Sequence, residues 1–176
     1  MIVYFLRHAN AGERFPNPKK DEKRALDKEG IEQCGYVGRA LAAMEAQVDA
    51  IITSPLKRST QTAALVGNEM GHEGKLIIDA ALRPTSQFAD FRKLLDRHAR
   101  LEAIMVVGHN PNLSEFLGRT ISDSGCEASL ELKKGAVAKV EVYRNAGILQ
   151  WCFTPKMLRS LYKAATDSSR PKTSRK

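Results

Sequence analysis

Short apolar runs alternate with segments of helical periodicity along most of the chain, and this alternation restricts the fold more than any other feature. The apolar runs have the length of buried strands and lie at 2–6, 49–53, 76–78 and 104–107. Two further β-like runs, 136–143 and 148–153, are joined by an Asn145-Ala146-Gly147 turn typical of a hairpin. Helical segments fall at 31–46, 57–70, 88–100 and 112–120. This order predicts a single-domain, three-layer α/β/α fold, with a mostly parallel central sheet and helices on both faces.

Two segments call for a closer local interpretation. The helical spacing of the segment at 31–46 predicts one buried face, formed by Ile31, Cys34, Val37, Leu41 and Met44. Residues 9–24 contain two prolines and a cluster of charges, which predicts a loop without regular structure.

Length and composition restrict the class of protein. A chain of 176 residues with 43% apolar and 27% charged residues has the size and composition of one globular domain. No run approaches the roughly 20 apolar residues of a membrane span, and the N-terminus lacks the pattern of a secretory signal, so we expect a cytoplasmic protein with no membrane partner. Cys34, Cys126 and Cys152 are odd in number and far apart, which predicts free thiols rather than disulfides or a zinc site.

The net charge of +8 is unevenly distributed. Residues 156–176 carry seven basic side chains and one acidic side chain, so the remaining residues are nearly balanced. We therefore divide the chain into a domain at 1–155 and a C-terminal segment at 156–176, with a helix at 156–165 and a disordered tail beyond it. Such a tail can contact an acidic partner or RNA, but a solvated end is the simpler interpretation, and the balanced body argues against a nucleic-acid partner.

Four candidate site residues lie just after predicted strands or at the start of a helix. Arg7 and His8 follow the first strand, His109 follows the strand at 104–107, and Arg58 begins the helix after the strand at 49–53. Open α/β sheets bind ligands beyond the carboxyl ends of their strands, where these residues are expected to meet. Position alone does not decide the matter, because a histidine at a strand end is more often a hydrogen-bonded structural residue.

The sequence around these residues resembles the histidine phosphatase superfamily. Arg7-His8-Ala9 is similar to its first motif, whose third residue is usually Gly, residues 53–63 (TSPLKRSTQTA) to its second block, and Gly108-His109-Asn110-Pro111 to its third. Residues 24–30 (RALDKEG) resemble a segment of the SixA-type protein-phosphohistidine phosphatases, a short bacterial branch. The order and spacing agree from residue 1 to about residue 154, so the resemblance implies a phosphoglycerate mutase-like fold.

The resemblance also implies a mechanism. His8 is expected to attack phosphorus with an unprotonated ring nitrogen, and Arg7 and Arg58 to grip the phosphoryl oxygens, so a phosphate or sulfate ion should bind between them. His109 is expected to be a third donor to the same oxygens, and a covalent phosphohistidine then forms on His8. No cofactor and no metal are expected, because clusters of carboxylates with metal-ligand spacing are absent and arginine supplies the positive charge.

Three further residues are weaker candidates for contacts to phosphate or substrate. Arg24 lies in the segment that matches the SixA-type branch, beside Lys19, Lys20 and Lys23, for which a solvated charge run is the favoured interpretation. Asn10 lies two residues after the nucleophile, and Ser59 follows Arg58; both are expected near the site, behind the residues that touch the phosphoryl group.

An expected general acid is missing from the sequence. Many superfamily members carry an acid after the third strand or directly after the second histidine, whereas here residues 82–85 (LRPT) contain none and Asn110 follows His109. The nearest downstream carboxylate, Asp90, falls in an apparent helix. An alkoxide leaving group gains about 10²–10⁴-fold from an acid, whereas imidazole leaves readily without one. This favours a phosphohistidine on a protein as the substrate, bound at an open, shallow site.

Two other interpretations stay open. The first is a phosphatase of the same superfamily acting on a small phosphate ester, which an acid from an unexpected position would support. The second is a non-catalytic phosphate-binding module, against which the nucleophile His8 argues.

Overall fold

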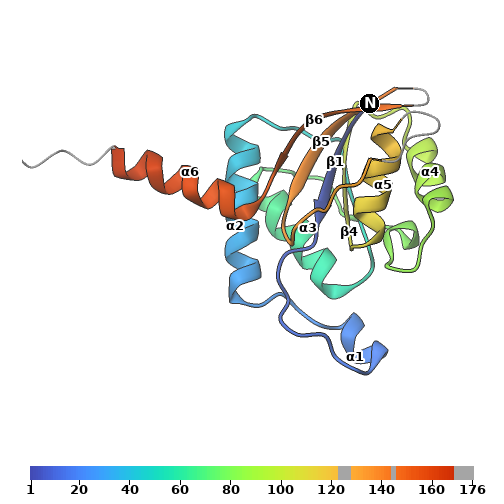
Figure 1. The fold of residues 1–176 in the computed structure, drawn as a ribbon, viewed down its shortest axis with the longest axis horizontal. Helices are drawn as coiled ribbons and strands as arrows, with labels where there is room; N and C mark the ends of the chain where they lie inside the picture. Colours follow the sequence, from blue (N-terminus) through green and yellow to red (C-terminus); the bar gives the residue numbers. More distant parts are fainter. Residues whose placement is uncertain (123–127, 144–145, 169–176) are drawn as a thin grey trace, which may run out of the picture.

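The computed structural model describes residues 1–122, 128–143 and 146–168, and shows one six-stranded sheet covered by helices on both faces (Figure 1). The strand order is β3-β2-β4-β1-β5-β6. Neighbours from β3 to β1 are parallel, and only β5 runs against its two neighbours, β1 and β6. The predicted α/β class and the mostly parallel sheet are confirmed.

The strands are β1 (Ile2–Arg7), β2 (Ala50–Thr53), β3 (Ile77–Ile78), β4 (Ala103–Gly108), β5 (Val137–Val142) and β6 (Gly147–Phe153). Each lies within about two residues of its predicted position, because a short apolar run between polar breaks is a strong strand signal. The predicted hairpin pairs β5 with β6, and Val142 lies opposite Gly147. Residue 145 of the predicted turn lies outside the described residues.

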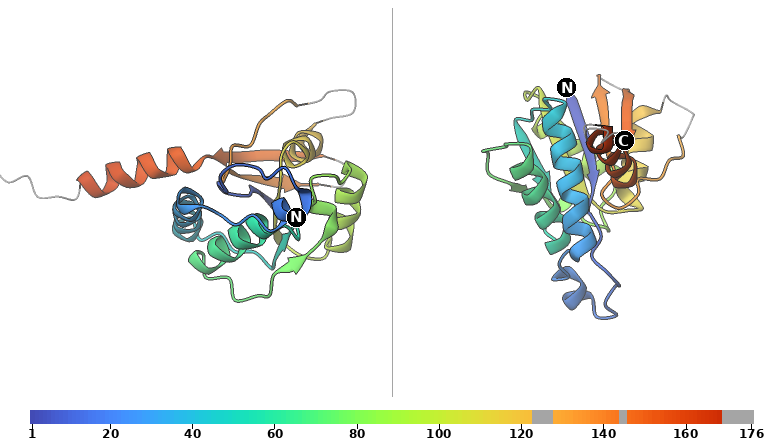
Figure 2. Two further views of the ribbon diagram at one scale, coloured as in Figure 1. Left: turned by 90° about the horizontal axis from the view of Figure 1, so that it is seen from below. Right: turned by 90° about the vertical axis from the view of Figure 1, so that its left-hand side faces the viewer.

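The helices are α1 (Pro18–Glu22), α2 (Lys28–Ala43), α3 (Lys57–Glu69), the 3-10 turn η1 (Ala80–Leu82), α4 (Phe88–Arg97), α5 (Asn112–Ile121) and α6 (Pro155–Ser168). Helices α4 and α5 cover one face of the sheet, and α2 and α3 cover the other (Figures 1 and 2). Strand residues alternate between the two cores: Val3 and Phe5 face α4 and α5, whereas Tyr4 and Leu6 face α2 and α3.

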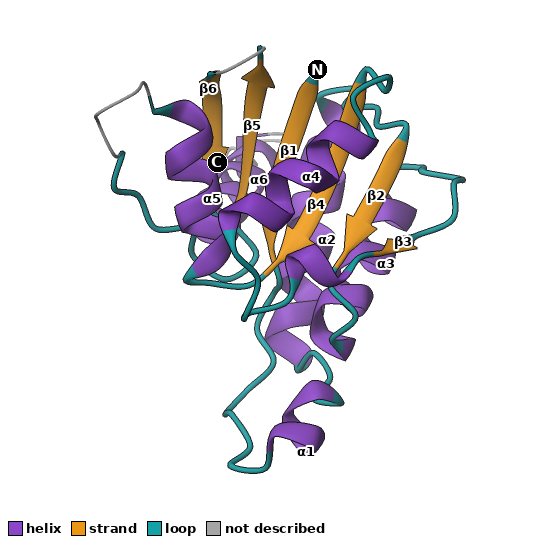
Figure 3. Cartoon of the chain, turned by 90° about the vertical axis from the view of Figure 1, so that its right-hand side faces the viewer, coloured by secondary structure: helices purple, strands orange, loops and turns teal. Residues whose placement is uncertain are grey.

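Helix α1 corrects the prediction that residues 9–24 lack regular structure. The Asn17 side chain accepts hydrogen bonds from the N–H groups of Lys19 and Lys20, and Pro18 occupies the first helical position. A proline there starts a helix rather than breaking it, because that N–H has no partner within the helix. Beyond the carboxyl ends of β1, β4 and β2, α1 projects from the body (Figure 3).

The predicted buried face of α2 is right at its centre and wrong at its ends. Cys34, Val37 and Leu41 are buried, whereas Ile31 and Met44 are 53% and 42% exposed. A spacing of 3.6 residues continues past the point where the sheet and α3 end, so periodicity does not show how far a partner surface reaches.

The C-terminal segment begins with α6 at Pro155, next to the predicted boundary at 155/156. The helix packs against α2 through Leu158 and through the rings of Tyr36 and Tyr162, 6.2 Å apart (Figure 2). The division at residue 155 stays a prediction. Disorder was predicted beyond residue 165, but α6 continues to Ser168, so the prediction is wrong for 166–168, and its remainder, 169–176, lies outside the described residues. Within the described chain no helix is long and apolar enough to span a membrane. Cys34 and Cys152 are free thiols, and Cys126 lies outside the described residues.

Candidate active site

The two predicted catalytic histidines meet because their strands are neighbours that end together. Arg7 at the end of β1 lies opposite Gly108 at the end of β4. The next residues extend this register: the N–H of His8 donates to the Gly108 carbonyl at 3.0 Å. As a result the rings of His8 and His109 lie 5.0 Å apart between centroids, although 101 positions separate them in the chain.

Five of the predicted site residues line one cleft of about 690 Å³ at this edge of the sheet. They are Arg7, His8, Arg24, Arg58 and His109. The two histidines and Arg58 are buried at its floor, whereas Arg14 and Thr85 at its mouth are exposed. The cleft is therefore open at the rim, and the polar side chains at its bottom are buried, which strengthens electrostatic interactions with a bound anion.

The tautomer of His8 follows from one hydrogen bond. Its Nδ1 lies 2.8 Å from the Ala9 carbonyl oxygen, which can only accept, so the proton is on Nδ1 and Nε2 keeps its lone pair. Burial lowers the pKa of His8 to about 3, and the positive charges of Arg58, Arg7 and Arg24 contribute further. His8 is therefore a neutral imidazole at pH 7, with Nε2 available as a nucleophile.

His109 lines the same cleft, and its tautomer also follows from one hydrogen bond. Its Nε2 lies 2.8 Å from the Ser54 hydroxyl, which has no other acceptor among the described residues. Ser54 therefore donates to Nε2, and the His109 proton is on Nδ1, a buried atom without a protein partner. Burial lowers the pKa of His109 to about 2, helped by His8 and Arg58, so this donor is a neutral N–H.

Arg7 and Arg58 are held by backbone carbonyls. Nη1 of Arg7 donates to the Leu132 carbonyl at 2.7 Å, and Nη1 of Arg58 donates to the Asp21 carbonyl at 3.0 Å. The Nε of each is buried and lacks a hydrogen-bond partner in the described part of the chain. Buried polar groups without partners are uncommon in native proteins. With His109 Nδ1, three such donors belong to residues that line this one cleft.

Asp21 is a member of the site that the sequence analysis missed. Its buried carboxylate accepts hydrogen bonds from Arg24 Nε at 2.8 Å and from the Phe15 N–H at 3.0 Å, and lies 3.4 Å from Arg58 Nη1. Burial alone would raise the pKa of Asp21, but the hydrogen bonds and the charges of Arg24 and Arg58 bring it below its usual value. Asp21 is thus an ionised carboxylate that orients two arginines. The spacing of Asp21 and Arg24, three apart, was the available signal.

The weaker candidates occupy different positions. Arg24 lines the cleft and donates through Nη1 to the Ala11 carbonyl at 2.9 Å. Asn10 and Ser59 lie outside the cleft lining. The Asn10 amide donates to Asp27 and Glu29, and the Ser59 hydroxyl bonds Thr53 and the Val107 carbonyl, which fixes α3 against β2 and β4. Both are placed behind the cleft wall, and their roles stay predictions.

The acids near the cleft are few. Asp21 is ionised, and Glu22 at the mouth pairs with Arg83 at 2.8 Å. Asn110, which follows His109, donates to the Leu132 carbonyl and accepts from Ser114, and Asp90 caps the start of α4. Among the described residues, no group of three or more His, Cys, Asp or Glu side chains is arranged to hold a metal ion.

A buried, neutral histidine beside two arginines at the carboxyl edge of this sheet is an arrangement that suits phosphoryl transfer. A family model of the histidine phosphatase superfamily (branch 1) matches residues 3–87. An uncharacterized protein of Picosynechococcus sp. is 31% identical over 140 residues, 78% of this chain and 82% of that protein. An uncharacterized protein of Mycobacterium tuberculosis is 28% identical over 146 residues, 81% and 88% of the two chains. The chain belongs to the histidine phosphatase superfamily.

Solved structures extend the likeness over the whole sheet. The protein histidine phosphatase SixA, complexed with tungstate, superposes with a TM-score of 0.80 at 20% identity, covering 90% of this chain and 99% of that chain. The alpha-ribazole phosphatase of Shigella flexneri gives 0.69 at 14% identity (88% and 97% covered). Phosphoglycerate mutase of Bacillus anthracis gives 0.69 at 15% identity (90% and 95%). These matches confirm the phosphoglycerate mutase-like fold.

Proposed function

We propose that the protein is a phosphatase that forms a covalent phosphohistidine on His8 and whose substrate is phosphohistidine on another protein. One observation carries the proposal: His8, whose Nε2 is unprotonated, lines a cleft together with Arg7, Arg58 and His109, each of which has a buried donor without a partner among the described residues. A phosphoryl group needs a nucleophile on one side and donors around its oxygens. Free phosphate or sulfate is expected to bind between Arg7 and Arg58.

In the first step, the Nε2 lone pair of His8 attacks phosphorus and the P–N bond of the substrate breaks. The bonding electron pair returns to the substrate nitrogen, and the substrate leaves as neutral imidazole because its other ring nitrogen already carries a proton. His8 becomes a phosphorylated imidazolium with its proton on Nδ1, held by the Ala9 carbonyl. Arg7, Arg58 and His109 donate to the oxygens of the transferred group throughout.

In the second step, water attacks the phosphorus on His8. The Nε2–P bond breaks, its electron pair returns to Nε2, and His8 is restored as the neutral Nδ1–H tautomer. The protons of the water leave with inorganic phosphate and solvent. Neither step needs an acid from the protein, which is consistent with a cleft whose carboxylates, Asp21 and Glu22, are both held by arginine.

The same reasoning supports a phosphoramidate over an ester. An ester oxygen has no second nitrogen to carry a proton, so its departure gains about 10²–10⁴-fold from a general acid. The similarity to the SixA fold supports the same choice. A cytoplasmic location is part of the proposal, and the free Cys34 and Cys152 suit a reducing compartment.

A second candidate is a phosphatase of a small phosphate ester. Glu22 favours it, because its exposed carboxylate lines the cleft mouth, within the cleft that a substrate would enter. The likeness to an alpha-ribazole phosphatase supports this alternative.

The experiment compares release of phosphate from a histidine-phosphorylated protein and from free phosphohistidine with release from a panel of phosphate esters. The wild-type chain is expected to act fast on the two phosphoramidates and slowly on the esters, with all activity lost in His8→Ala. Faster turnover of one ester, abolished by Glu22→Gln, would establish the second candidate instead. Release from none of the substrates would leave a phosphate-binding module.

A further inference from the structure

A basic surface stands at the mouth of the cleft. We call it the basic lip: residues 14–23, with the exposed side chains of Arg14, Phe15, Lys19, Lys20 and Lys23. It includes α1, which projects beyond the carboxyl ends of the central strands (Figure 3). Among the described residues the three lysines make no ion pair, and Phe15 is 47% exposed. The lip therefore presents unpaired cations and one apolar ring to the solvent.

The lip is tied to the catalytic arginines rather than free to move away from them. Asp21 lies within it and turns inward, where it accepts from Arg24 and from the Phe15 N–H. Arg58 donates to the Asp21 carbonyl, and Asn17 caps α1. The inward face of this short helix thus holds the arginines that line the cleft. The lysines stand on the other side and do not line the cleft.

Positive charge is concentrated at this edge of the domain. Residues 1–155 contain 21 Lys and Arg against 19 Asp and Glu. Nine of the basic side chains and two of the acidic ones (Asp21 and Glu22) belong to the lip or line the cleft, so the rest of the domain carries 12 basic and 17 acidic side chains. An oriented charge distribution of this kind attracts a partner of opposite charge to one face.

We propose that the basic lip docks an acidic protein surface that surrounds the phosphohistidine of the substrate; this inference rests on the proposed function. A bound phosphoryl group is satisfied by the buried donors of the cleft, which leaves the outward lysines to contact the substrate protein around it. Lysines on flexible stems increase association rates through long-range attraction. Phe15 supplies the apolar contact that such an interface needs at its centre.

The test compares three substrates: free phosphohistidine, a histidine-phosphorylated domain with acidic residues around the phosphorylated side chain, and the same domain with those acids changed to glutamine. The lip variant is Lys19→Glu/Lys20→Glu/Lys23→Glu. The matched control is Lys75→Glu/Lys93→Glu/Arg100→Glu, three exposed cations that do not line the cleft. Phe15→Ala probes the apolar contact separately.

For the wild type and the control, kcat/KM on the acidic domain is expected to exceed that on the glutamine domain by about 10-fold at low salt and to fall as salt rises. The lip variant should lose this preference and keep its activity on free phosphohistidine. Phe15→Ala should lower kcat/KM on the two domains by the same factor at every salt concentration. Equal effects of the lip and control variants, or a preference independent of salt, would overturn the proposal.

Binding keeps the docking claim separate from the catalytic one. The His8→Ala chain is titrated with the same two phosphorylated domains, with and without the lip substitutions. Tighter binding of the acidic domain that depends on the lysines supports docking even if no substrate is hydrolysed. Hydrolysis of all three substrates without any charge dependence overturns docking alone. Lip-dependent binding of a single-stranded RNA without preference for the acidic domain would also overturn it, in favour of a nucleic-acid partner.

Discussion

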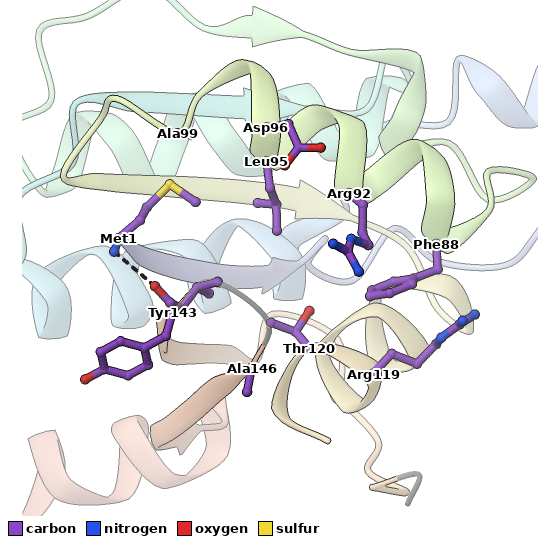
Figure 4. Close-up of a pocket in the computed structure, with 11 residues that line it drawn as sticks. Met1, Phe88, Arg92, Leu95, Asp96, Ala99, Arg119, Thr120, Tyr143 and Ala146 are labelled. Atoms are coloured by element: carbon purple, nitrogen blue, oxygen red, sulfur yellow. Dashed lines mark hydrogen bonds between the residues drawn. The ribbon is translucent and has the colours of Figure 1, made fainter. Parts of the chain in front are cut away.

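Two hollows with arginines in their walls lie at opposite ends of the sheet, and they differ in how those arginines are satisfied. The catalytic cleft lies at the carboxyl ends of the parallel strands. A groove of about 470 Å³ lies at the other end, between α4, α5 and the start of β1, with Met1, Phe88 and Leu95 among its lining side chains (Figure 4). In the groove, Arg92 and Arg119 are exposed, and Arg119 lies 4.3 Å from the centre of the Phe88 ring and pairs with Glu115.

The difference supports the proposal that the chemistry occurs at the carboxyl ends of the strands. An exposed guanidinium beside a ring is hydrated, so the groove is stable as it stands. Arg58 in the cleft is buried, with a donor that no described residue satisfies, and burying a charge in that way is costly. The groove is the more apolar hollow, yet the proposed oxyanion site is the cleft, because three of the residues that line it have buried nitrogens without a partner among the described residues.

The largest effect that would test this comparison is loss of the nucleophile. His8→Ala is expected to lower kcat on free phosphohistidine by about 10⁴-fold or more, because no other group in the cleft can form the covalent intermediate. Leu95→Ala in the groove is the matched control and should retain full activity. Phosphate bound to enzyme that is rapidly denatured at alkaline pH, measured with labelled substrate, should appear on the wild type and be absent from His8→Ala. Persistent labelling of the variant would place the intermediate elsewhere.

The second largest effect is tested by the same change, arginine to lysine, in the cleft and in the groove. Arg58→Lys keeps the charge and loses the planar fork, so kcat/KM is expected to fall by about 10²-fold or more. Arg119→Lys in the groove should change it less than about twofold, because an exposed ion pair contributes little. Inorganic phosphate should inhibit the Arg58→Lys enzyme far more weakly than the wild type. Equal losses from both substitutions would contradict the assignment of the cleft as the oxyanion site.

Local sequence patterns predicted some residues of the cleft, whereas residues whose position depends on contacts with distant parts of the chain were missed. Arg7, His8 and His109 were found because they follow apolar runs, and a run that ends in a charged residue indicates the edge of a buried strand. Helix α1 was missed because Pro18 was interpreted as a breaker, whereas it is the first residue of the helix. Asp21 was missed for the same reason: in a presumed loop it looked like one more solvated charge. Its burial depends on Arg58, which is 37 positions away.

Asp21 gives a smaller, graded effect. Asp21→Asn is expected to lower kcat/KM by roughly 10-fold, because Arg24 and Arg58 keep their charge but lose the carboxylate that orients them. It should also lower the free energy of unfolding by about 2 kcal/mol, the usual contribution of hydrogen bonds to a charged group. Asp96→Asn, in the groove wall, should change neither quantity.

Inhibition by inorganic phosphate distinguishes a positioning role of Asp21 from a purely structural one. If Asp21 positions the arginines, the affinity for phosphate should weaken in Asp21→Asn and recover in part in Asp21→Glu, at temperatures where all three chains are folded. If only stability changes and phosphate affinity does not, Asp21 holds the lip in place and has no influence on the cleft.

The smallest expected effect concerns the protonation of His8 and His109. Neither ring is expected to gain a proton in mildly acidic solution. Burial among arginines lowers the pKa values of His8 and His109 to about 3 and about 2, so both rings should stay neutral from pH 8 down to about 4 in the phosphate-free enzyme. The unfolded chain has histidine pKa values of about 6.5 and binds protons over this range. Each of the two histidines therefore lowers the free energy of unfolding as the pH falls from 6.5 toward its pKa in the folded protein.

Nitrogen chemical shifts of the His8 and His109 rings measure their protonation directly. Dianionic phosphate should raise the His109 pKa, because it places negative charge beside the His109 ring. Titration near 6.5 without phosphate would show that the two rings are more hydrated than their burial implies, and the contrast between a cleft with buried polar groups and a groove with exposed ones would then be lost.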